Sequence, residues 1–168
     1  HPEADVDDAV VRLKRVFGIQ WLSAATPINR EDVGEDLSGL VELAIDIAKE
    51  NIGTAKTFRV TARRSDKSFH KTSLEIEQHV GGEIHEVIQV PAKMKHPDYT
   101  LNILVLKEKI LLFSNKQRCF GGLPVGSSGK LMSLLSGGID SPVASWMMMK
   151  RGCTVEFVHF HTGRSIEE

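Results

Sequence analysis

The sequence has few cysteines, no long apolar run and no excess of either charge, and each shortage excludes a class of protein. Its two cysteines, Cys119 and Cys153, form no C-x-x-C pair. A disulfide framework and an all-cysteine zinc site are therefore excluded, and a reducing cytosol is the expected compartment. The longest apolar runs, such as 103–106 and 146–149, are far shorter than the roughly 20 residues that a spanning helix needs. We expect a cytoplasmic protein without a membrane segment.

The charges balance, with 21 Lys and Arg against 22 Asp and Glu and a formal net charge of -1. No overall basic excess argues for nucleic acid, so any such site must be local. The N-terminus is acidic where a secretory signal would be basic, and it has no initiator Met. We therefore expect a chain cut from a longer protein. Its 41% hydrophobic residues are enough to form the cores of one or two domains.

Residues 1–28 predict one helix and one strand. Apolar residues at spacings of four, three and three predict an amphipathic helix over 5–16, which Gly18 ends. Residues 19–25 predict a strand that Thr26-Pro27 closes, because a proline biases the preceding residue away from helix. One helix and one strand cannot bury their apolar faces alone, so we interpret this segment as the end of a domain whose start is missing.

Residues 29–118 predict one compact α+β domain. The expected elements are a helix over 37–51, a strand over 57–62, a helix over 73–79 that ends at Gly81-Gly82, and strands over 86–90, 101–106 and 110–114. This order of helices and strands fits one compact α+β domain.

A glycine-rich linker over 119–130 leads into a strand, helix, strand pattern over 131–168. Mostly apolar strands are expected at 131–135 and 154–161, with a helix at 142–151 between them. This pattern is typical of a βαβ unit in a parallel sheet. Such a sheet needs more than two strands, so we expect the domain that begins here to be incomplete.

The strongest chemical signal is Ser136-Gly137-Gly138-Ile139-Asp140-Ser141, between the first strand and the helix of this unit. At such a corner the helix N–H groups face outward with the positive end of the helix dipole, and glycines let a phosphate approach the backbone. We expect Ser141 to be the N-cap and Pro142 to be the first helical residue. Asp140 would repel a phosphate unless a cation intervened, which predicts Mg²⁺ bound together with a nucleotide.

Each of these features also has a simpler interpretation. A tight βα turn without a ligand is disfavoured by the strand before the loop and the helix after it. A Walker A loop is excluded at Gly129-Lys130, because Pro124 stands where its first glycine is required and Leu131 replaces the Ser or Thr. His159 and His161 alternate on a strand, but no third ligand is near, and packed or exposed histidines are commoner than metal pairs.

Four segments of the chain together carry a family resemblance: the lead-in 121–126, the stretch 134–144, Met149-Lys150-Arg151-Gly152 and His159-Phe160-His161. In these segments the chain resembles the tRNA 4-thiouridine synthetase family. The loop alone marks the wider PP-loop ATP pyrophosphatases, which include other tRNA thiolases and amidating synthetases. After His161 the family usually continues with a serine- and proline-containing turn that residues 162–168 lack.

The middle of the chain supports the narrower match. Residues 63–69 followed by 73–76 resemble a THUMP domain, an RNA-binding module, and His96-Pro97-Asp98-Tyr99 sits where that module has a similar turn. Phe17-Gly18-Ile19 resembles the end of the ferredoxin-like domain that precedes THUMP in this family. The resemblance therefore implies an α/β chain, with 1–28 as the end of that domain, 29–118 as an α+β THUMP domain and 131–168 as the start of a parallel-sheet PP-loop domain.

The resemblance also implies a reaction. The intact enzyme would use ATP to adenylate the C4 oxygen of a tRNA uridine, and sulfur from a persulfide carrier such as a cysteine desulfurase would displace AMP to give 4-thiouridine. The same transfer can feed thiamine thiazole synthesis, and a homodimer is compatible with the family. The catalytic cysteine would lie beyond Glu168, so this chain is expected to be inactive alone.

The resemblance gives roles to residues of this sequence. Asp140 is the expected catalytic residue. The expected nucleotide-binding residues are Leu134, Leu135, Ser136, Gly137, Gly138, Ile139, Asp140, Ser141, His159 and Phe160.

A local run of cations is the expected RNA-binding site. Its members are Lys56, Arg59, Arg63, Arg64, Lys67 and Lys71, opposed in this stretch by the single Asp66. Taken alone, the run is better interpreted as a solvated strand face, but the THUMP resemblance favours RNA contact. Phosphate contacts would give affinity with little sequence information and a steep salt dependence. Phe69 could stack on a base, although a place in the core is the commoner one.

Two alternatives stay open. A non-catalytic RNA-binding module is one, because the THUMP segment is whole and the PP-loop segment is not. Another PP-loop ATP pyrophosphatase without an RNA substrate is the other. The sequence beyond residue 168 would separate them, because a catalytic cysteine and further nucleotide contacts are expected there.

Overall fold

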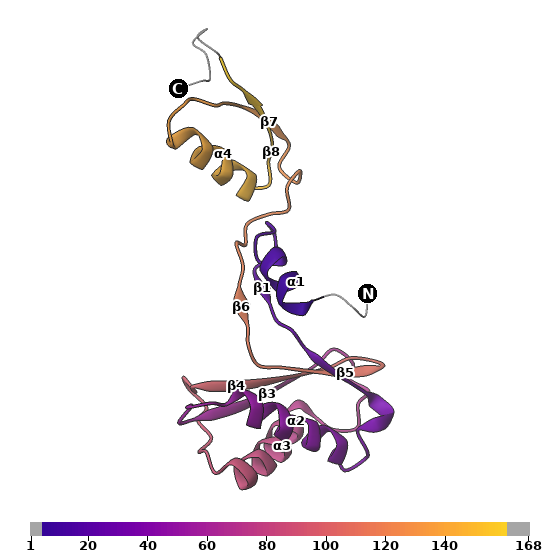
Figure 1. Cartoon of the computed structure of the whole chain (residues 1–168). Coiled ribbons are helices and arrows are strands. Elements are labelled where there is room, and N and C mark those ends of the chain that lie inside the picture. Colours follow the sequence, from indigo (N-terminus) through magenta and orange to yellow (C-terminus); the bar gives the residue numbers. More distant parts are fainter. Residues whose placement is uncertain (1–4, 161–168) are drawn as a thin grey trace. The chain divides into compact units, whose positions relative to one another are not determined.

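The structure, a computed structural model, describes residues 5–160, which form parts of two compact units (Figure 1). One unit is Ser23–Lys116, and the other joins the residues up to Leu22 with those from Gln117 onward. No helix in the described range is long and apolar enough to cross a membrane. The predictions for His161 and for the tail 162–168 concern residues outside that range.

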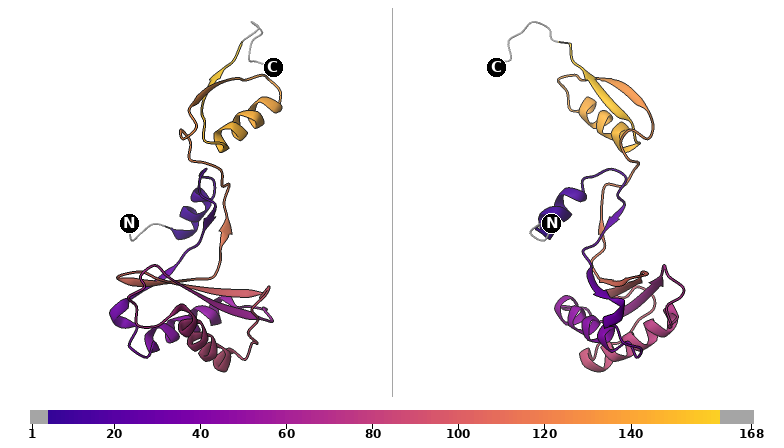
Figure 2. Two further views of the ribbon diagram at one scale, coloured as in Figure 1. Left: turned by 180° about the vertical axis from the view of Figure 1, so that it is seen from behind. Right: turned by 90° about the vertical axis from the view of Figure 1, so that its right-hand side faces the viewer.

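The unit Ser23–Lys116 is a four-stranded sheet with helices on one face (Figures 1 and 2). Its elements are β2 (Thr26–Asn29), η1 (Arg30–Asp32), α2 (Ser38–Asn51), β3 (Phe58–Arg64), α3 (Ser73–Ile88), β4 (Tyr99–Val105) and β5 (Lys109–Phe113). The order across the sheet is β2-β5-β4-β3, and β3 pairs in parallel with β4 while the other pairs are antiparallel. Parallel strands need a crossover connection, and α3 provides it.

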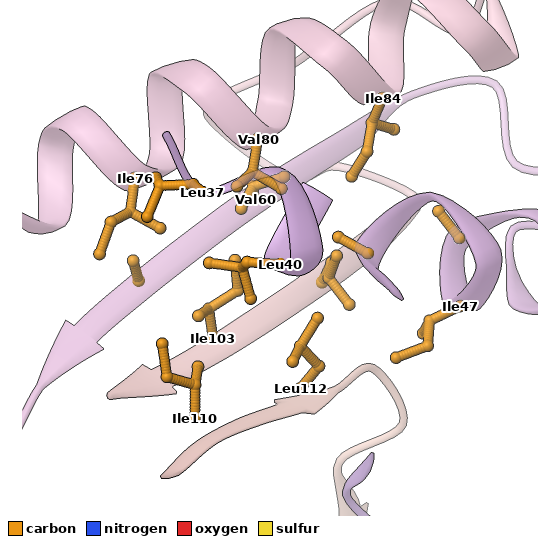
Figure 3. Close-up of a cluster of buried hydrophobic side chains, with 14 of the residues drawn as sticks. Leu37, Leu40, Ile47, Val60, Ile76, Val80, Ile84, Ile103, Ile110 and Leu112 are labelled. Carbon is orange, nitrogen blue, oxygen red and sulfur yellow. The ribbon is translucent and has the colours of Figure 1, made fainter. Parts of the chain in front are cut away.

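Buried and half-buried residues alternate along the strands, and this alternation shows which face of the sheet is buried. Phe58, Val60 and Ala62 of β3 are buried, and the residues between them are only half-buried. Strand β4 alternates in the same way over all its residues. Figure 3 shows three α3 side chains, Ile76, Val80 and Ile84, directed toward the sheet, and all three are fully buried. The core of this unit therefore lies between one sheet face and the two α-helices.

Helix α3 corrects two predictions. It runs through Gly81 and Gly82 to Ile88, so the helix end expected at this glycine pair and the strand expected at 86–90 are both wrong. A glycine inside a helix costs about 1 kcal/mol relative to alanine. Burial of one large aliphatic side chain contributes about 1.5–3 kcal/mol, and Ile84 is fully buried beyond the pair while Ile88 packs partly against the core. Burial of the apolar stripe therefore outweighs the glycine penalty.

Strand β2 corrects another prediction. Thr26-Pro27 does not close a strand but begins β2, in which Pro27 lies opposite Leu111 of β5. Strand β2 is at the edge of the sheet. An edge strand tolerates proline because only one of its sides has to supply N–H groups to a neighbour. The strand expected at 19–25 is reduced to β1 (Trp21–Leu22), which pairs with β6 (Gln117–Arg118).

The second unit contains the predicted βαβ arrangement. Its elements are α1 (Val6–Leu13), β1, β6, β7 (Lys130–Leu134), α4 (Asp140–Lys150) and β8 (Thr154–Val158). Strands β7 and β8 pair in parallel, with Leu134 opposite Val158 at their carboxyl ends, and α4 connects them (Figure 2). The prediction of a parallel βαβ unit is confirmed. Helix α1 confirms the helix expected in 5–16 over a shorter range.

The loop between β3 and α3 is held in place by Arg64. The Arg64 Nη1 donates to the carbonyl of Phe69 at 3.3 Å and to that of Lys71 at 3.0 Å. Helix α3 then begins with a capping box, in which the N–H of Thr72 donates to the Glu75 carboxylate at 2.7 Å and the N–H of Glu75 donates to the Thr72 hydroxyl at 3.2 Å. The connection into α3 is therefore closed by hydrogen bonds within the chain.

We predict that Gly82→Ala raises the free energy of unfolding by about 0.5–1 kcal/mol, because alanine loses less backbone entropy on folding. A Cβ at Gly82 would meet no atom within 4 Å, so the substitution creates no clash. Urea unfolding measures the change. The matched control is Gly53→Ala, at a φ of +51° where alanine is strained, and it should lower stability. Destabilisation by Gly82→Ala would contradict a continuous α3.

We predict an acid-sensitive contribution from Asp66. The N–H and hydroxyl of Ser68 and the guanidinium of Arg30 lower the pKa of the Asp66 carboxyl from 3.8 to about 2. A carboxyl with a lowered folded-state pKa stabilises the fold above its ordinary pKa, so this contribution is lost as the pH falls from about 4 to about 2. Carbon-13 NMR titration of the carboxyl measures the value. Ser68→Ala and Arg30→Met should each raise it, and an unshifted pKa in the unmodified protein would contradict these contacts.

Candidate functional site

The loop between β7 and α4 presents unused backbone N–H groups at the carboxyl end of a parallel strand. The N–H groups of Gly137, Ile139 and Asp140 make no hydrogen bond to another residue in the range 5–160. They precede or begin α4, an 11-residue helix whose N-terminus carries partial positive charge. Ligands of parallel sheets bind in the crevice outside the carboxyl ends of the strands. The loop therefore has the geometry of a phosphate site.

The two glycines of the loop are not needed for its backbone path. Neither Gly137 nor Gly138 has a positive φ. An added Cβ would meet no atom within 4 Å at Gly137 and only the Ser136 Oγ, at 3.6 Å, at Gly138. The fold would therefore accept a side chain at both positions. Room for a phosphate against the backbone explains the pair better than turn geometry does.

The two serines of the motif hold the loop in shape. The N–H of Ser136 donates to the Oγ of Ser141 at 3.0 Å, and the two hydroxyl oxygens are also 3.0 Å apart. The N–H of Gly138 donates to the Ser136 Oγ at 3.3 Å. The hydroxyls therefore hold the loop from within, and the N–H groups of Gly137, Ile139 and Asp140 keep no partner among the described residues.

The start of α4 corrects the capping prediction. The helix begins at Asp140, and its N-cap is Ile139, which makes no side-chain capping bond. Ser141 is not the N-cap, because its hydroxyl accepts the N–H of Ser136 instead. Pro142 is the third helical residue rather than the first, and it is tolerated there because first-turn N–H groups have no partner in the helix.

Asp140 lies in the first turn of α4, where the helix dipole favours a negative charge. Its side chain is exposed and joins none of the ion pairs found in the described range. That range contains no group of three or more His, Cys, Asp or Glu that could hold a metal ion. A cation at Asp140 would therefore need ligands from a bound phosphate. Mg²⁺ is commonly held by one or two carboxylates together with substrate phosphates, so the site fits Mg²⁺ in this form.

Apolar side chains and one histidine lie around the loop. Leu134, Ile139 and Phe160 are 64%, 84% and 76% exposed. The Leu135 carbonyl accepts from the Nδ1 of His159 at 2.7 Å, which assigns the ring proton to Nδ1. His159 follows the end of β8 rather than lying on the strand as expected. The structure thus brings 134–141 and His159 together at one end of the β7–β8 pair.

The six cations expected to bind RNA do not form one surface. On β3, Arg59 and Arg63 lie on the sheet face away from the helices, and Arg64 points to the opposite face. Arg63 is exposed, whereas Arg59 donates to the carbonyl of Met94 at 3.0 Å. The remaining members lie outside the strand, with Lys56 and Lys67 exposed and Lys71 half-buried.

One expected RNA contact, Arg64, and the aromatic residue for which stacking on a base was the alternative, Phe69, are both used inside the fold. Arg64 holds the loop before α3 through two carbonyls, as described above. Phe69 is only 4% exposed and lies in the core, with the Arg30 guanidinium 5.0 Å from its ring centre. The core interpretation of Phe69 is therefore confirmed. The Arg30 Nη1 donates to the Asp66 carboxylate at 2.6 Å. The sequence did not predict this contact, because 36 residues separate the two.

The open sheet face contains a hollow that sequence reasoning missed. It has a volume of about 660 Å³, and its lining includes Arg63, Asn102, Phe113 and Lys116. Sheet register explains the grouping, because Asn102 pairs with Thr61 on one side and with Phe113 on the other. The Lys116 Nζ lies 5.7 Å from the centre of the Phe113 ring. Cations beside an amide and an aromatic ring suit unpaired nucleotides.

Two family models match the chain. The THUMP domain model matches residues 35–115, within the unit that holds the four-stranded sheet. The model described as Thiamine biosynthesis protein (ThiI) matches residues 126–168, which include the loop and the βαβ unit.

Curated relatives match nearly the whole chain. A protein described as "Probable tRNA sulfurtransferase" from Caldanaerobacter subterraneus subsp. tengcongensis is 42% identical over 161 residues, which are 95% of this chain and 40% of the relative. A protein of the same description from Staphylococcus epidermidis is 40% identical over 162 residues, 96% of this chain and 38% of the relative. The chain thus spans about 40% of the length of the curated relatives it matches.

Solved structures match the fold. A 4-thiouridine synthetase in complex with RNA and ATP has a TM-score of 0.79 and 34% identity, covering 97% of this chain and 41% of that one. A protein from Pyrococcus horikoshii has a TM-score of 0.80 and 32% identity, covering 93% of this chain and 52% of that one. These matches agree in their order along the chain with the sheet, the loop and the βαβ unit, and the chain is similar over nearly its whole length to one part of the tRNA 4-thiouridine synthetase family.

Proposed function

We propose that this chain supplies the RNA-binding unit and the phosphate loop of a tRNA uridine 4-sulfurtransferase that acts in the cytoplasm. The observation that carries the proposal is the loop 136–139, with three unused N–H groups at the N-terminus of α4. A relative of the same fold was solved with RNA and ATP together, which supports both ligands. Another PP-loop enzyme without an RNA substrate is disfavoured, because the THUMP match covers residues 35–115 of the unit Ser23–Lys116.

The proposed reaction has three steps. The C4 oxygen of a tRNA uridine attacks the α-phosphorus of ATP, and pyrophosphate leaves. The outer sulfur of a persulfide, supplied by a cysteine desulfurase or another carrier, then attacks C4, and AMP leaves with the former C4 oxygen. A second thiol then cleaves the disulfide that links C4 to the carrier, which releases 4-thiouridine and leaves that thiol in a disulfide with the carrier. The same sulfur transfer would serve thiamine thiazole synthesis.

Residues of this chain would bind and orient the nucleotide. The N–H groups of Gly137, Ile139 and Asp140 would hold the phosphates, and Ser136 and Ser141 keep these groups in place. The exposed apolar side chains of Leu134 and Phe160, beside Leu135 and His159, give the base a surface on which to lie. Asp140 would hold Mg²⁺, which when bound offsets the charge that develops on the pyrophosphate.

RNA would bind to the open face of the four-stranded sheet. The exposed Arg63 lines the hollow there together with Lys116 and Phe113, and Lys56 and Lys67 are exposed on adjoining loops. Lysine and arginine contacts to phosphates give affinity independent of base identity, and an aromatic ring accepts any unpaired base. Arg59, Arg64 and Lys71 are more engaged with the fold and would contribute less.

We predict different effects for the two positions of the loop motif. Gly138→Val should abolish ATP binding, because its side chain would occupy the space of the phosphate, and its Cβ would make only an ordinary contact, 3.6 Å from the Ser136 Oγ. Asp140→Ala should leave ATP affinity less affected and lower kcat in the full-length enzyme by about 100-fold or more, as for loss of one group that stabilises developing charge.

Calorimetric ATP titration and single-turnover thiolation of tRNA measure the two effects separately. The matched control is Glu156→Ala, which removes an exposed carboxylate on β8 that lies 4.0 Å from Lys130 and should change neither value. Normal turnover in Asp140→Ala would remove this carboxylate from the mechanism. ATP binding by Gly138→Val would remove the loop from the phosphate site.

We predict that the neighbours Arg63 and Arg64 differ in their roles. Arg63→Glu should weaken binding to all tRNA sequences and flatten the slope of affinity against salt, because it removes a phosphate contact. Arg64→Ala should instead lower the free energy of unfolding by about 1 kcal/mol, because two loop carbonyls lose their donor. Fluorescence anisotropy over a salt series and urea unfolding separate the two effects.

The charge control for Arg63 is Lys49→Glu, which makes the same change at an exposed position on α2, on the helical side of the unit. It should leave the salt slope nearly unchanged. If Arg63→Glu and Lys49→Glu behave alike, the open sheet face is not the RNA site.

A further inference from the structure

Ser145 is a buried polar side chain that the proposed function does not use. It lies on α4 and is 2% exposed, the one fully buried polar residue in the range 5–160. Buried hydroxyls are retained where hydrogen bonds satisfy them, and each such group constrains the packing around it. The hydrogen-bond partners of the Ser145 hydroxyl therefore show which parts of the unit it holds together.

The hydrogen bonds of Ser145 have one direction. Its Oγ donates to the carbonyl oxygen of Ser141 at 2.7 Å, and a carbonyl can only accept. A hydroxyl has one proton, so the 2.7 Å contact between the Oγ atoms of Ser133 and Ser145 must be donated by Ser133. A directed chain therefore runs from strand β7 through Ser145 to the first turn of α4.

This chain of hydrogen bonds reaches the phosphate loop. Ser133 lies on β7 before the loop, and Ser141 lies on α4 after it. Ser141 in turn accepts the N–H of Ser136 at its Oγ, and Ser136 accepts the N–H of Gly138. Both flanks of the loop are thus tied to one buried hydroxyl. Apolar contacts between a helix and a strand permit small shifts, whereas a hydrogen-bonded pair is satisfied in one register only.

We propose that Ser145 is a positioning residue for the nucleotide loop: with Ser133 as its donor, it fixes the first turn of α4 against β7 and so sets the spacing of the N–H groups of Gly137, Ile139 and Asp140. The inference rests on the proposed function, because it names the residue that sets the geometry of the same phosphate site. Ser145 acts only through Ser141 and contacts no phosphate itself.

The test compares variants of the 168-residue chain by two readouts. Nitrogen-15 NMR without nucleotide follows the amide signals of Gly137 and Gly138, and calorimetry follows the affinity for inorganic pyrophosphate and for ATP. Ser145→Ala should move both glycine signals and weaken pyrophosphate binding about fivefold to thirtyfold, the usual effect of losing one buried hydrogen bond. Ser145→Thr retains the hydroxyl and should restore both readouts.

Two further variants make the test specific. Ser128→Ala is the matched control, because the Ser128 Oγ donates at 2.8 Å to the carbonyl of Arg151, just past the other end of α4. It should move neither glycine signal. Ser133→Ala should move the glycine signals in the same direction as Ser145→Ala. The double variant should bind pyrophosphate no more weakly than Ser145→Ala does, since both residues act through one chain of hydrogen bonds.

The outcomes separate this inference from the proposed function. A lower melting temperature in Ser145→Ala with unmoved glycine signals would show a merely structural serine and overturn the inference. If Ser145→Ala or Ser145→Thr does not fold, Ser133→Ala decides by the same signals, because its side chain is only half-buried. Absence of ATP and pyrophosphate binding in the unmodified chain would contradict the proposed function, while glycine signals that still respond to Ser145→Ala would support the positioning role.

Discussion

Parallel strand pairing is the constraint on which both units of this protein depend. Parallel neighbours need a crossover helix, and each unit has one: α3 joins β3 to β4, and α4 joins β7 to β8. The crossover places a helix N-terminus next to the carboxyl end of the first strand. Each unit therefore contains a corner at which N–H groups without helical partners must find an acceptor.

The two corners meet this requirement in different ways. Before α3, the chain supplies its own anion, because the Glu75 carboxylate and the Thr72 hydroxyl accept the N–H groups at the start of the helix. Before α4, no side chain caps the helix, and the serine hydroxyls accept the N–H groups of Ser136 and Gly138 but not those of Gly137, Ile139 and Asp140. The same supersecondary unit thus has a closed corner in the unit Ser23–Lys116 and an open corner with unpartnered N–H groups in the second unit.

The four-stranded sheet of the unit Ser23–Lys116 likewise separates its basic side chains between two faces. Adjacent residues of a strand point to opposite faces, so Arg63 is exposed on the open face while Arg64 donates to carbonyls of the loop before α3. A run of basic residues in a sequence therefore contains two kinds of arginine. Arg63 on the open face is available to a phosphate, whereas Arg64 on the helical face stabilises the loop before α3.

The sequence by itself determined the features that depend on local order. Ser136 to Ser141 between two apolar strands predicts an anion loop, because phosphate binding needs glycine, hydroxyl and helix N-terminus in a fixed succession. Alternation at Phe58, Val60 and Ala62 likewise predicts a strand with one buried face. Only the tertiary structure decided that α3 continues through Gly81 and Gly82, since the burial of Ile84 that outweighs two glycines depends on a sheet formed elsewhere in the chain. Pairing between β4 and β5 decided that Phe113 joins Asn102 and Arg63 around one hollow, because such neighbours are set by register and by no local pattern.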